Sequence, residues 1–309
     1  MNVNIMLLGG ARRVTLLEQI KRIGNDHGIY IDFISVEKDE GFYPISSYAR
    51  VIAGPKFNTE EFSIFLKKQL SELANTIIVP CMDAAIPPLA KIAEESFSDR
   101  IVAPTSLGAE IALDKSLTSN FCEKYSIPHP QRFSINSKFM SKVIAKPKQG
   151  FGGKGIAIFE TLSQVPSTLF ESHIVQEYIN GQETTHDVYM LDDGSFFSAS
   201  RTRLAVIDGE VDHCIVRDST ESELALFDVI SRTNLFRGPI TIQTINCDGK
   251  DYLIEINARL GGGVTASIEA GYPVVELILE KFLHIEITKR QFRPLEMKRA
   301  RRDFYRIID

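Results

Sequence analysis

Cysteine is scarce in this sequence, and its cysteines are scattered. The 309 residues include four of them, Cys81, Cys122, Cys214 and Cys247, with no CxxC pair. This spacing suits a reducing, cytoplasmic environment better than a disulfide framework of the secreted type or a zinc site. We expect the four thiols to serve as small apolar side chains in the core.

Long apolar runs are absent as well. The first run extends only from Ile5 to Leu8 and has no basic segment before it, so we expect neither a signal peptide nor a membrane span. The net charge of −5 gives no general attraction to nucleic acid. We therefore expect small-molecule partners, with no nucleic acid and no membrane, and a homodimer is left open.

One basic stretch departs from the overall charge. Residues 289–306 are rich in Lys and Arg. The favoured interpretation is a solvated terminal helix, because a run of like charge usually forms an exposed face. The alternatives are that this tail covers a phosphate-binding cleft or contributes to a dimer contact.

The composition that is present is ordinary for a globular mixed α/β protein. It is 44% hydrophobic and 24% charged, with 20 Gly and 13 Pro. A chain of 309 residues is too long for one small core and fits two or three packed units. We expect a cleft between these units.

The first hundred residues alternate strand and helix patterns. This alternation predicts βαβ units and a parallel sheet. The expected strands are residues 3–8, 30–36 and 76–79, and the expected helices are residues 14–23 and 62–73.

The second half has a different pattern. A helical segment at residues 116–124 is followed by Ile127-Pro128-His129-Pro130, where no helix can continue. Hairpin turns then appear at residues 192–194 and 208–209. The expected fold is an α/β N-terminal domain with a parallel sheet, followed by an α+β region with mainly antiparallel sheets.

A glycine-rich stretch follows the apolar strand at residues 143–145, which delivers Lys146. Its glycines are Gly150, Gly152, Gly153 and Gly155. They would let backbone amides approach a polyphosphate with no Cβ in the way. A Walker A loop is rejected, because Lys154 is followed by glycine and then a strand rather than by Ser or Thr and a helix. Taken alone, a plain flexible hairpin is the better interpretation.

A second candidate segment is Gln176-Glu177-Tyr178-Ile179, followed by Asn180-Gly181 and Glu183. A strand edge that ends at Asn-Gly can offer a free carbonyl and a free amide to an adenine, while Glu183 could accept hydrogen bonds from ribose hydroxyls. Taken alone, the segment is an ordinary strand and turn.

The third candidate is a hairpin formed by residues 240–245 and 252–257. A two-residue loop would mix polar and apolar side chains on both faces. A three-residue loop would set Gln243 opposite Glu255 and place Asn257 on the same face, so we favour that register. The resulting set of oxygens suits a magnesium ion that also binds ATP phosphates. The alternative is the solvent-facing side of an amphipathic hairpin.

In this order, the segments resemble the ATP-grasp superfamily, most closely the ATP-binding domains of carbamoyl phosphate synthetase and related stand-alone carboxylate ligases. The resemblance runs from about Thr105 to Leu283. It implies three regions: residues 1–104 as a preceding βαβ domain, 105–185 as the small lid subdomain, and 186–309 as the large subdomain. Its anchors are Leu113-Asp114-Lys115, Ile144-Ala145-Lys146-Pro147, the Gly150 to Gly155 loop, Gln176-Glu177-Tyr178-Ile179 with Glu183, and Glu255-Ile256-Asn257-Ala258-Arg259.

The resemblance implies a bound ATP. Lys115 and Lys146 would contact phosphates, and the loop of Gly150, Gly152, Gly153 and Lys154 would close over them. The adenine edge would be recognised by the carbonyl of Glu177 and the amide of Ile179, within the segment that includes Gln176 and Tyr178. Glu183 would bind the ribose.

The resemblance also implies the catalytic groups. Gln243, Glu255 and Asn257 would hold one or two Mg²⁺ ions, for which Mn²⁺ could substitute. Arg259 would stabilise the transferring phosphoryl group. The product would be an acyl phosphate that an amine or another nucleophile attacks, and no protein nucleophile is required.

Some features lie outside the resemblance. The chain is far too short for a full carbamoyl phosphate synthetase, and no glutamine-hydrolysing unit is recognisable. Arg201 and Arg203 have the spacing of one strand face, and one of them, with Arg201 as the candidate, is expected to bind the substrate carboxylate or the γ-phosphate. A surface pair is the alternative.

Two rival functions come from other classes. A nicotinamide-dependent oxidoreductase is suggested by Gly9-Gly10 after the first strand and Glu37 at the end of the second, but the G-x-G-x-x-G fingerprint is incomplete. We expect this turn, with Arg12 and Arg13, to shape part of the substrate site instead, together with Met82-Asp83. A nucleotide-binding protein without catalysis is disfavoured, because it has no need for a site that balances charge in a transition state.

Overall fold

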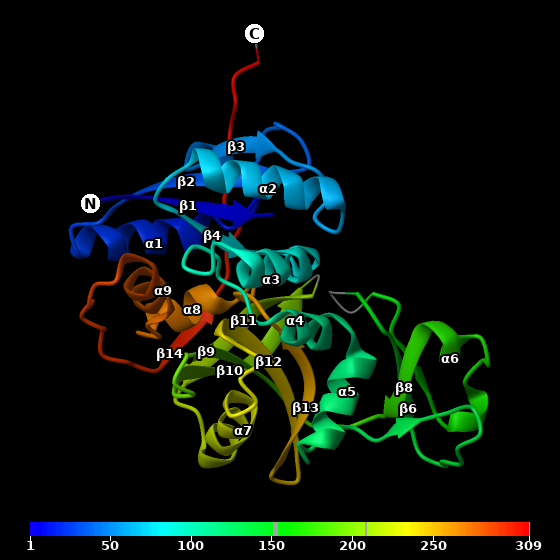
Figure 1. The fold of residues 1–309 in the computed structure, drawn as a ribbon. Helices are drawn as coiled ribbons and strands as arrows, with labels where there is room; N and C mark the ends of the chain where they lie inside the picture. The colour runs from blue at the N-terminus through cyan, green and yellow to red at the C-terminus, as the bar shows by residue number, and fades with distance from the viewer. Residues whose placement is uncertain (151–153, 208, 309) are drawn as a thin grey trace.

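The N-terminal part of the molecule contains a four-stranded parallel sheet (Figure 1). The structure is a computed structural model, and it describes residues 1–150, 154–207 and 209–308. The strand order is β3-β2-β1-β4. The strands are β1 (Asn2–Leu8), β2 (Tyr30–Glu37), β3 (Arg50–Ala53) and β4 (Thr76–Pro80). The expected parallel sheet is confirmed.

Helices cover both faces of this sheet. Leu16, Leu17 and Ile20 of α1 (Val14–Asp26) pack on one face. On the other face lie α2 (Glu60–Glu72) and α3 (Ile86–Glu95). Because both faces are covered, the central strands are apolar along most of their length.

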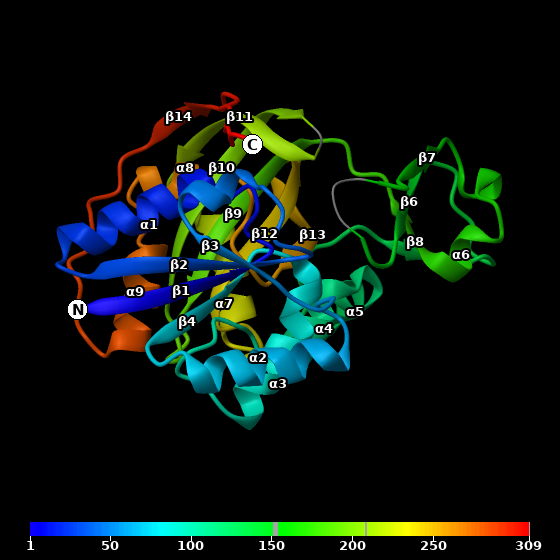
Figure 2. The same ribbon diagram turned by 90° about the horizontal axis from the view of Figure 1, so that it is seen from above.

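A small lobe stands apart from the rest of the molecule (Figure 2). Its antiparallel sheet has the order β5-β8-β6-β7, and its own small core includes Phe133, Val143 and Val175. Its elements are β5 (Arg132–Phe133), β6 (Val143–Pro147), β7 (Ala157–Phe159), α6 (Leu169–Ser172) and β8 (His173–Glu177).

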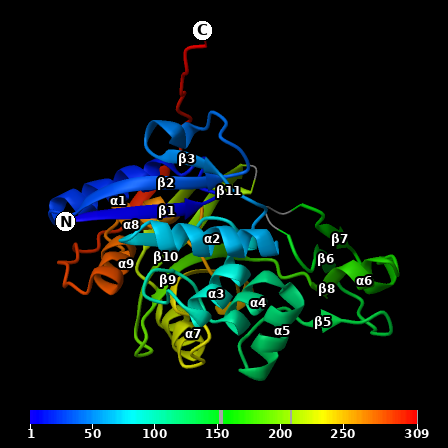
Figure 3. The same ribbon diagram turned by 45° about the horizontal axis from the view of Figure 1, so that its top comes forward.

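The largest sheet is antiparallel and six-stranded, with the order β13-β12-β9-β10-β11-β14. Its strands β9, β10 and β11 are labelled in Figure 3. Its strands are β9 (Gln182–Met190), β10 (Phe196–Ile207), β11 (Glu210–Arg217), β12 (Gly238–Cys247), β13 (Lys250–Asn257) and β14 (Leu295–Lys298). The expected change from a parallel to an antiparallel architecture is therefore confirmed.

Two groups of helices pack on the six-stranded sheet. One apolar cluster joins Val188 and Ile240 of the sheet to α4 (Ser106–Leu113), α5 (Lys115–Lys124) and α7 (Glu221–Ser231). The opposite face packs against α8 (Val264–Glu269) and α9 (Val274–Leu283), and the same core continues into β1 and α1. The N-terminal sheet and the large sheet therefore share a core.

These contacts bear on the expected domain limits. The helices α4 and α5 pack on the six-stranded sheet, although residues 105–185 are expected to form the lid. Residue 185 lies within β9, which belongs entirely to the large sheet. We propose that the lid comprises residues 132–177 and that α4 and α5 belong to the large subdomain, since a domain limit falls between strands rather than inside one.

The β12–β13 hairpin has the expected pairing near the site, but not the expected loop. Cys247 pairs with Lys250, so the loop has two residues, Asp248 and Gly249, both with positive φ. Such a loop matches the twist of the flanking strands. A register shift after Gln243 then sets that residue opposite Glu255. The three-residue loop was wrong, because a bulge on β13 makes the same one-residue correction.

The basic C-terminal stretch is not a helix, which corrects the favoured interpretation. Within it, β14 pairs with β11 at the edge of the large sheet, and the following residues run past the N-terminal sheet (Figure 1). The alternation of exposure along β14 is that of an edge strand. Local charge did not indicate this strand, because its pairing partner is about eighty residues earlier in the chain.

The cysteines largely follow expectation. Cys81, Cys122 and Cys214 are buried, whereas Cys247 is half-buried beside the hairpin loop. Burial raises the pKa of the Cys122 thiol to about 12. Among the described residues, the helices are all too short or too polar to cross a lipid bilayer.

Candidate active site

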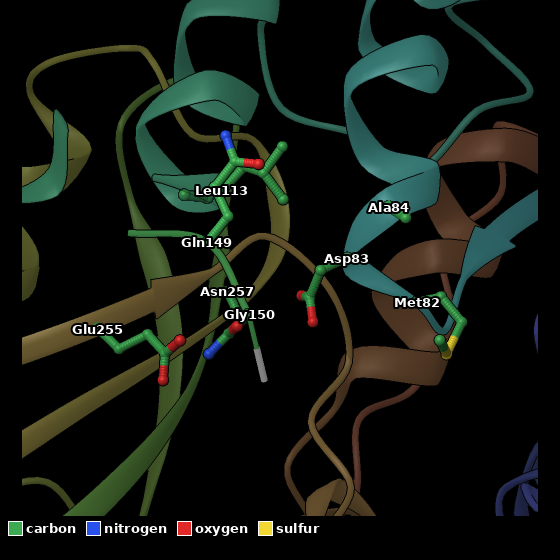
Figure 4. A pocket seen from close by; sticks show the side chains of 9 residues that line it. Met82, Asp83, Ala84, Leu113, Gln149, Gly150, Glu255 and Asn257 are labelled. Carbon is green, nitrogen blue, oxygen red and sulfur yellow. The ribbon is translucent and has the colours of Figure 1, made fainter. Parts of the chain in front are cut away.

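A pocket of about 270 Å³ lies where four segments meet. Met82, Asp83 and Ala84 approach from the N-terminal sheet, and Leu113 from the end of α4. Gln149 and Gly150 come from the glycine-rich stretch, and Glu255 and Asn257 from β13. In Figure 4 the carboxylate of Glu255 and the amide of Asn257 project from one strand, with Asp83 facing them from the other side.

Lys115 is held at this pocket by both its backbone and its side chain. It is the first residue of α5, which Asp114 caps by accepting from the amides of Ser116 and Leu117. Its own amide donates to the carbonyl of Lys148 at 2.9 Å. Its Nζ lies 3.2 Å from Oε1 of Glu255 and donates to the carbonyl of Gly150 at 3.2 Å.

Lys146 is a buried cation near the same carboxylate. It lies on β6 and is only 7% exposed. Its pKa is lowered to about 8, mainly by burial and in part by the neighbouring Lys115, while Glu255 and Glu183 act in the opposite direction. Lys115, Lys146 and Glu255 therefore interact electrostatically.

The three predicted metal ligands share one sheet face. Gln243 pairs directly with Glu255, and Asn257 is two positions along β13. Their single carboxylate and two amide oxygens are hard donors that suit Mg²⁺. Within residues 1–150, 154–207 and 209–308, no three His, Cys, Asp or Glu side chains gather as a metal cage. The set therefore fits a cation that takes further oxygens from a bound phosphate.

Arg259 forms a forked ion pair that the sequence did not reveal. Its Nε and Nη2 donate to the two carboxylate oxygens of Asp83 at 2.7 and 2.8 Å, and its Nη1 donates to the carbonyl of Leu260 at 3.2 Å. Burial would lower the pKa of Arg259, but the Asp83 carboxylate outweighs burial and raises it. The pair fixes the guanidinium beside the pocket and ties the large subdomain to the N-terminal sheet.

The predicted adenine-binding edge has free backbone groups. The amide of Glu177 donates to Gln131, and that of Tyr178 donates to Lys142. The carbonyl of Glu177 and the amide of Ile179 have no hydrogen-bond partner among the described residues. Gln176 is buried, with its side chain directed to the carbonyl of Pro130 at 3.5 Å.

Two residues that were predicted to contact a ligand form ion pairs within the protein. Glu183, the expected ribose ligand, forms an ion pair with Arg203. Arg201 is 2% exposed and donates to both carboxylate oxygens of Asp187, at 2.7 and 3.1 Å, and Ser267 donates to the same carboxylate. The structure thus contradicts substrate contact by Arg201, because its donors are used in the interior. A strand pattern places Arg201 on a face but cannot show what covers that face.

The glycine-rich stretch is described only in part. Gly152 and Gly153 lie outside the described residues. Gly150 and Gly155 have φ of 143° and 75°, backbone conformations that favour glycine. Lys154 is exposed.

At the turn that suggested a nicotinamide site, the Glu37 carboxylate is used in hydrogen bonds within the protein. Glu37 is buried, and it accepts hydrogen bonds from the Ser35 hydroxyl and from the amides of Gly10 and Ala11. Burial raises the pKa of Glu37 overall, against these hydrogen bonds. Since its carboxylate stabilises the β1–α1 turn, it is not placed to bind a ribose.

A second, larger cavity of about 800 Å³ lies between the start of α1 and the C-terminal tail. Arg12 and Arg13, which were expected to shape part of the substrate site, line this cavity. Its other arginines belong to the tail, for which a solvated helix was the favoured interpretation and the covering of a phosphate-binding cleft was an alternative. The arginines that line the cavity are Arg12, Arg13, Arg299, Arg301 and Arg302.

Comparison with known proteins identifies the domain. Residues 112–263 match the family model of the ATP-grasp domain. This part of the chain is an ATP-grasp domain, which confirms the resemblance to that superfamily over a shorter range than the expected 105–283. No curated protein matches the sequence.

Solved structures agree on the fold. An L-amino acid ligase from Bacillus licheniformis is 17% identical, with a TM-score of 0.68 over 91% of this chain and 74% of that one. N5-carboxyaminoimidazole synthetase from Staphylococcus aureus, complexed with ADP, is 15% identical, with a TM-score of 0.74 over 96% and 82%. Biotin carboxylase from Campylobacter jejuni is 14% identical, with a TM-score of 0.65 over 92% and 72%. The protein therefore has the fold of the ATP-grasp ligases.

Proposed function

We propose that this protein is a Mg²⁺- and ATP-dependent ligase that phosphorylates a carboxylate and transfers the acyl group to an amine or another nucleophile. The observation that carries the proposal is the meeting of Lys115, Lys146 and Glu255, which come from three distant segments. Because Glu183, the other carboxylate near Lys146, is already paired with Arg203, the two lysines beside Glu255 leave unbalanced positive charge. The phosphates of ATP would balance it.

The nucleotide would lie between the small lobe and the large sheet. The free carbonyl of Glu177 and the free amide of Ile179 offer the acceptor and donor that an adenine edge requires. Lys146 would lie along the phosphates, and Gly150 would approach them without a Cβ. Glu183 would bind the ribose by exchanging its Arg203 partner for the sugar hydroxyls.

The residues at the pocket fit a magnesium ion held jointly with ATP. Glu255, Asn257 and Gln243 would supply its protein oxygens, and the bound ion would neutralise charge on the transferring phosphoryl group. Lys115 is paired with Glu255 in this structure. On nucleotide binding it would contact phosphate and leave the carboxylate to the ion.

The remaining groups would position the reaction. Arg259, fixed by Asp83, would face the phosphoryl oxygens, where charge develops during transfer. In-line phosphoryl transfer depends on positioning and electrostatics, so no protein nucleophile is needed. The resulting acyl phosphate would be attacked by the second substrate, and closure of the small lobe would exclude water.

The first test is thermal unfolding with Mg-ATP, with ATP plus a chelator, and with NAD or NADP. A ligand at about 100 times its dissociation constant adds about 2.7 kcal/mol to the free energy of unfolding. We expect a rise in Tm with Mg-ATP that the chelator reduces. A rise with NAD or NADP alone would overturn the proposal. Stabilisation by Mg-ATP without ADP release, across a panel of acids and amines, would indicate a nucleotide-binding protein without catalysis.

A further inference from the structure

The larger cavity carries more positive than negative charge in a protein whose net charge is −5. Five arginines line it, and the carboxylates in its lining are Glu210, Asp212 and Asp303. By the usual ionisation of these groups the lining carries a charge of about +2, or about +1 once Glu18, which pairs with Arg302, is counted. A local excess of this kind in a concave site attracts anions.

Three of the arginines are available to a ligand. Arg299 pairs with Glu210, and Arg302 donates to Glu18 at 2.8 Å. Arg13 makes only a long hydrogen bond, 3.4 Å, to the carbonyl of Gly261. Arg12 and Arg301 have no ion pair or hydrogen bond with any described residue and are exposed at the cavity. With Glu210 paired to Arg299, the remaining carboxylates of the lining, Asp212 and Asp303, could neutralise at most two of these three guanidinium groups.

The start of α1 adds to the positive electrostatic potential of the larger cavity. Val14 and Thr15, in its first turn, line the cavity. This 13-residue helix has no side-chain cap and no acidic residue in its first turn. Its amide groups and dipole therefore face the cavity without an internal negative partner.

The C-terminal tail holds its arginines at the cavity. The amide of Arg299 donates to the carbonyl of Asp212 on β11, which extends the edge pairing of β14. Three residues later, Arg302 reaches Glu18 on α1 and lies over the ring of Tyr48. The tail thus bridges the large sheet and the N-terminal sheet, with Arg301 between two anchored positions.

The two cavities adjoin the same chain segment. Asn257 lines the first pocket, Arg259 lies beside it, and Gly262 lines the second cavity. An acid in the second cavity could therefore present a carboxylate near Arg259, with the rest of the molecule extending toward α1 and the tail.

We infer that the acceptor acid of the proposed ligase carries a second anionic group, a carboxylate or a phosphate, and that Arg301 and Arg12 bind this group. This inference rests on the proposed function. Arg301 is a specificity-determining residue contributed by the tail. The second anion lies at the end of the cavity away from the reacting carboxylate, and it balances the excess arginine charge.

The test measures binding of defined acids by thermal unfolding at constant ionic strength, without nucleotide. One arm compares dicarboxylates from malonate to adipate with their monoamides, and the other compares O-phosphoserine with serine. The first arm detects a carboxylate and the second a phosphate as the second anion. We expect at least one dianionic probe to raise Tm more than the matched compound that lacks the second charge.

Variants assign the effect to the two arginines. Arg301→Gln and Arg12→Gln should each raise the dissociation constant of that probe at least about tenfold, as expected for loss of a charge-assisted hydrogen bond. Arg293→Gln is the matched control, because Arg293 is exposed in the same C-terminal region but lines neither cavity. No discrimination in either arm, or an equal loss in Arg293→Gln, would overturn the inference.

A parallel measurement with Mg-ATP on the wild-type protein separates the two proposals. Stabilisation by Mg-ATP without discrimination among acids overturns the dianionic substrate and leaves the ligase proposal standing. Discrimination among acids without stabilisation by Mg-ATP supports the anion site and overturns the ligase proposal.

Discussion

Two clusters of ionisable side chains occupy opposite faces of the six-stranded sheet, and they differ in how completely their charges are paired. At the pocket, Lys115 and Lys146 lie near one carboxylate, Glu255. On the other face, His186 bonds through Nδ1 to Ser200 and through Nε2 to Thr244, both at 2.8 Å. The face that would bind nucleotide leaves charge unmatched, and the other face satisfies its polar atoms internally.

The second cluster is completed by Glu223 of α7. This carboxylate is 2% exposed and accepts from both Nη atoms of Arg217, at 2.9 and 2.6 Å, from Ser200 and from the amide of Thr220. Such a network stabilises one arrangement of strand and helix. Changes to the first cluster should therefore affect activity with little effect on stability, and changes to the second should do the reverse.

The largest effect is expected for Glu255→Ala. It removes the carboxylate among the three proposed metal ligands, and ADP formation should fall by about 100-fold or more, the scale for losing one group that stabilises transition-state charge. Steady-state ADP release measures this. Tm should change little, because Glu255 is partly exposed at a pocket. Glu40→Ala, at an exposed site outside both cavities, is the control. Near-normal turnover would contradict the magnesium assignment.

The next effect is expected for Glu223→Ala, which should lower the free energy of unfolding by about 3 kcal/mol, because Arg217 and Ser200 lose a buried partner. Urea unfolding with an unchanged m-value would measure it. Glu221→Ala, in the same first turn of α7 but exposed, should cost far less. Equal losses in the two variants would refute the contrast between the clusters.

Stability should also depend on pH through His186. Burial lowers its pKa to about 4, so the folded state keeps it neutral while the unfolded chain takes up a proton near pH 6.5. The unfolded state therefore binds more protons between these values, and stability should fall on the order of 3 kcal/mol as pH drops from 6.5 to 4. Chemical unfolding at several pH values in this range should show that the free energy of unfolding depends less steeply on pH in His186→Gln than in the wild-type protein. Parallel slopes would exclude His186 as the cause.

The smallest effect concerns Lys146. With its pKa near 8, its charge is largely present at pH 7 and largely lost at pH 9 in the free protein. Phosphates favour the charged form, so ATP affinity should fall about tenfold between these pH values. Titration calorimetry measures this change. Lys146→Arg retains its charge at pH 9, so its ATP affinity should not depend on pH in this way. An unchanged pH dependence in that variant would show that another group causes it.

The unpaired cluster was partly predictable from the sequence, and the paired one was not. Glu255 and Asn257 have the period-two spacing of one strand face, and the register that brings Gln243 to them follows from sorting polar from apolar side chains. His186 and Glu223 carry no comparable local signal. Their pairing depends on where α7 docks, and helix docking is a long-range packing outcome.

The errors have the same origin. Arg201 and Arg203 share a strand face as expected, but only the docking of α8 buries Arg201 against Asp187 and Ser267. Arg259 meets Asp83 across 176 residues, an ion pair that no local pattern indicates. The tail was expected to be a helix because its charge is local information, while its pairing with β11 is not.

Sequence alone indicated the alternating strands and helices of the first hundred residues and the change from parallel to antiparallel architecture, and the resemblance to the ATP-grasp superfamily added the candidate site residues. The first two follow from hydrophobic period and turn residues, which act over a few residues. Tertiary structure decided which charges are compensated: Lys115 by Glu255, Arg259 by Asp83, and Arg301 by no described residue. Compensation requires two side chains to meet in space, and only the packed fold brings such distant segments together.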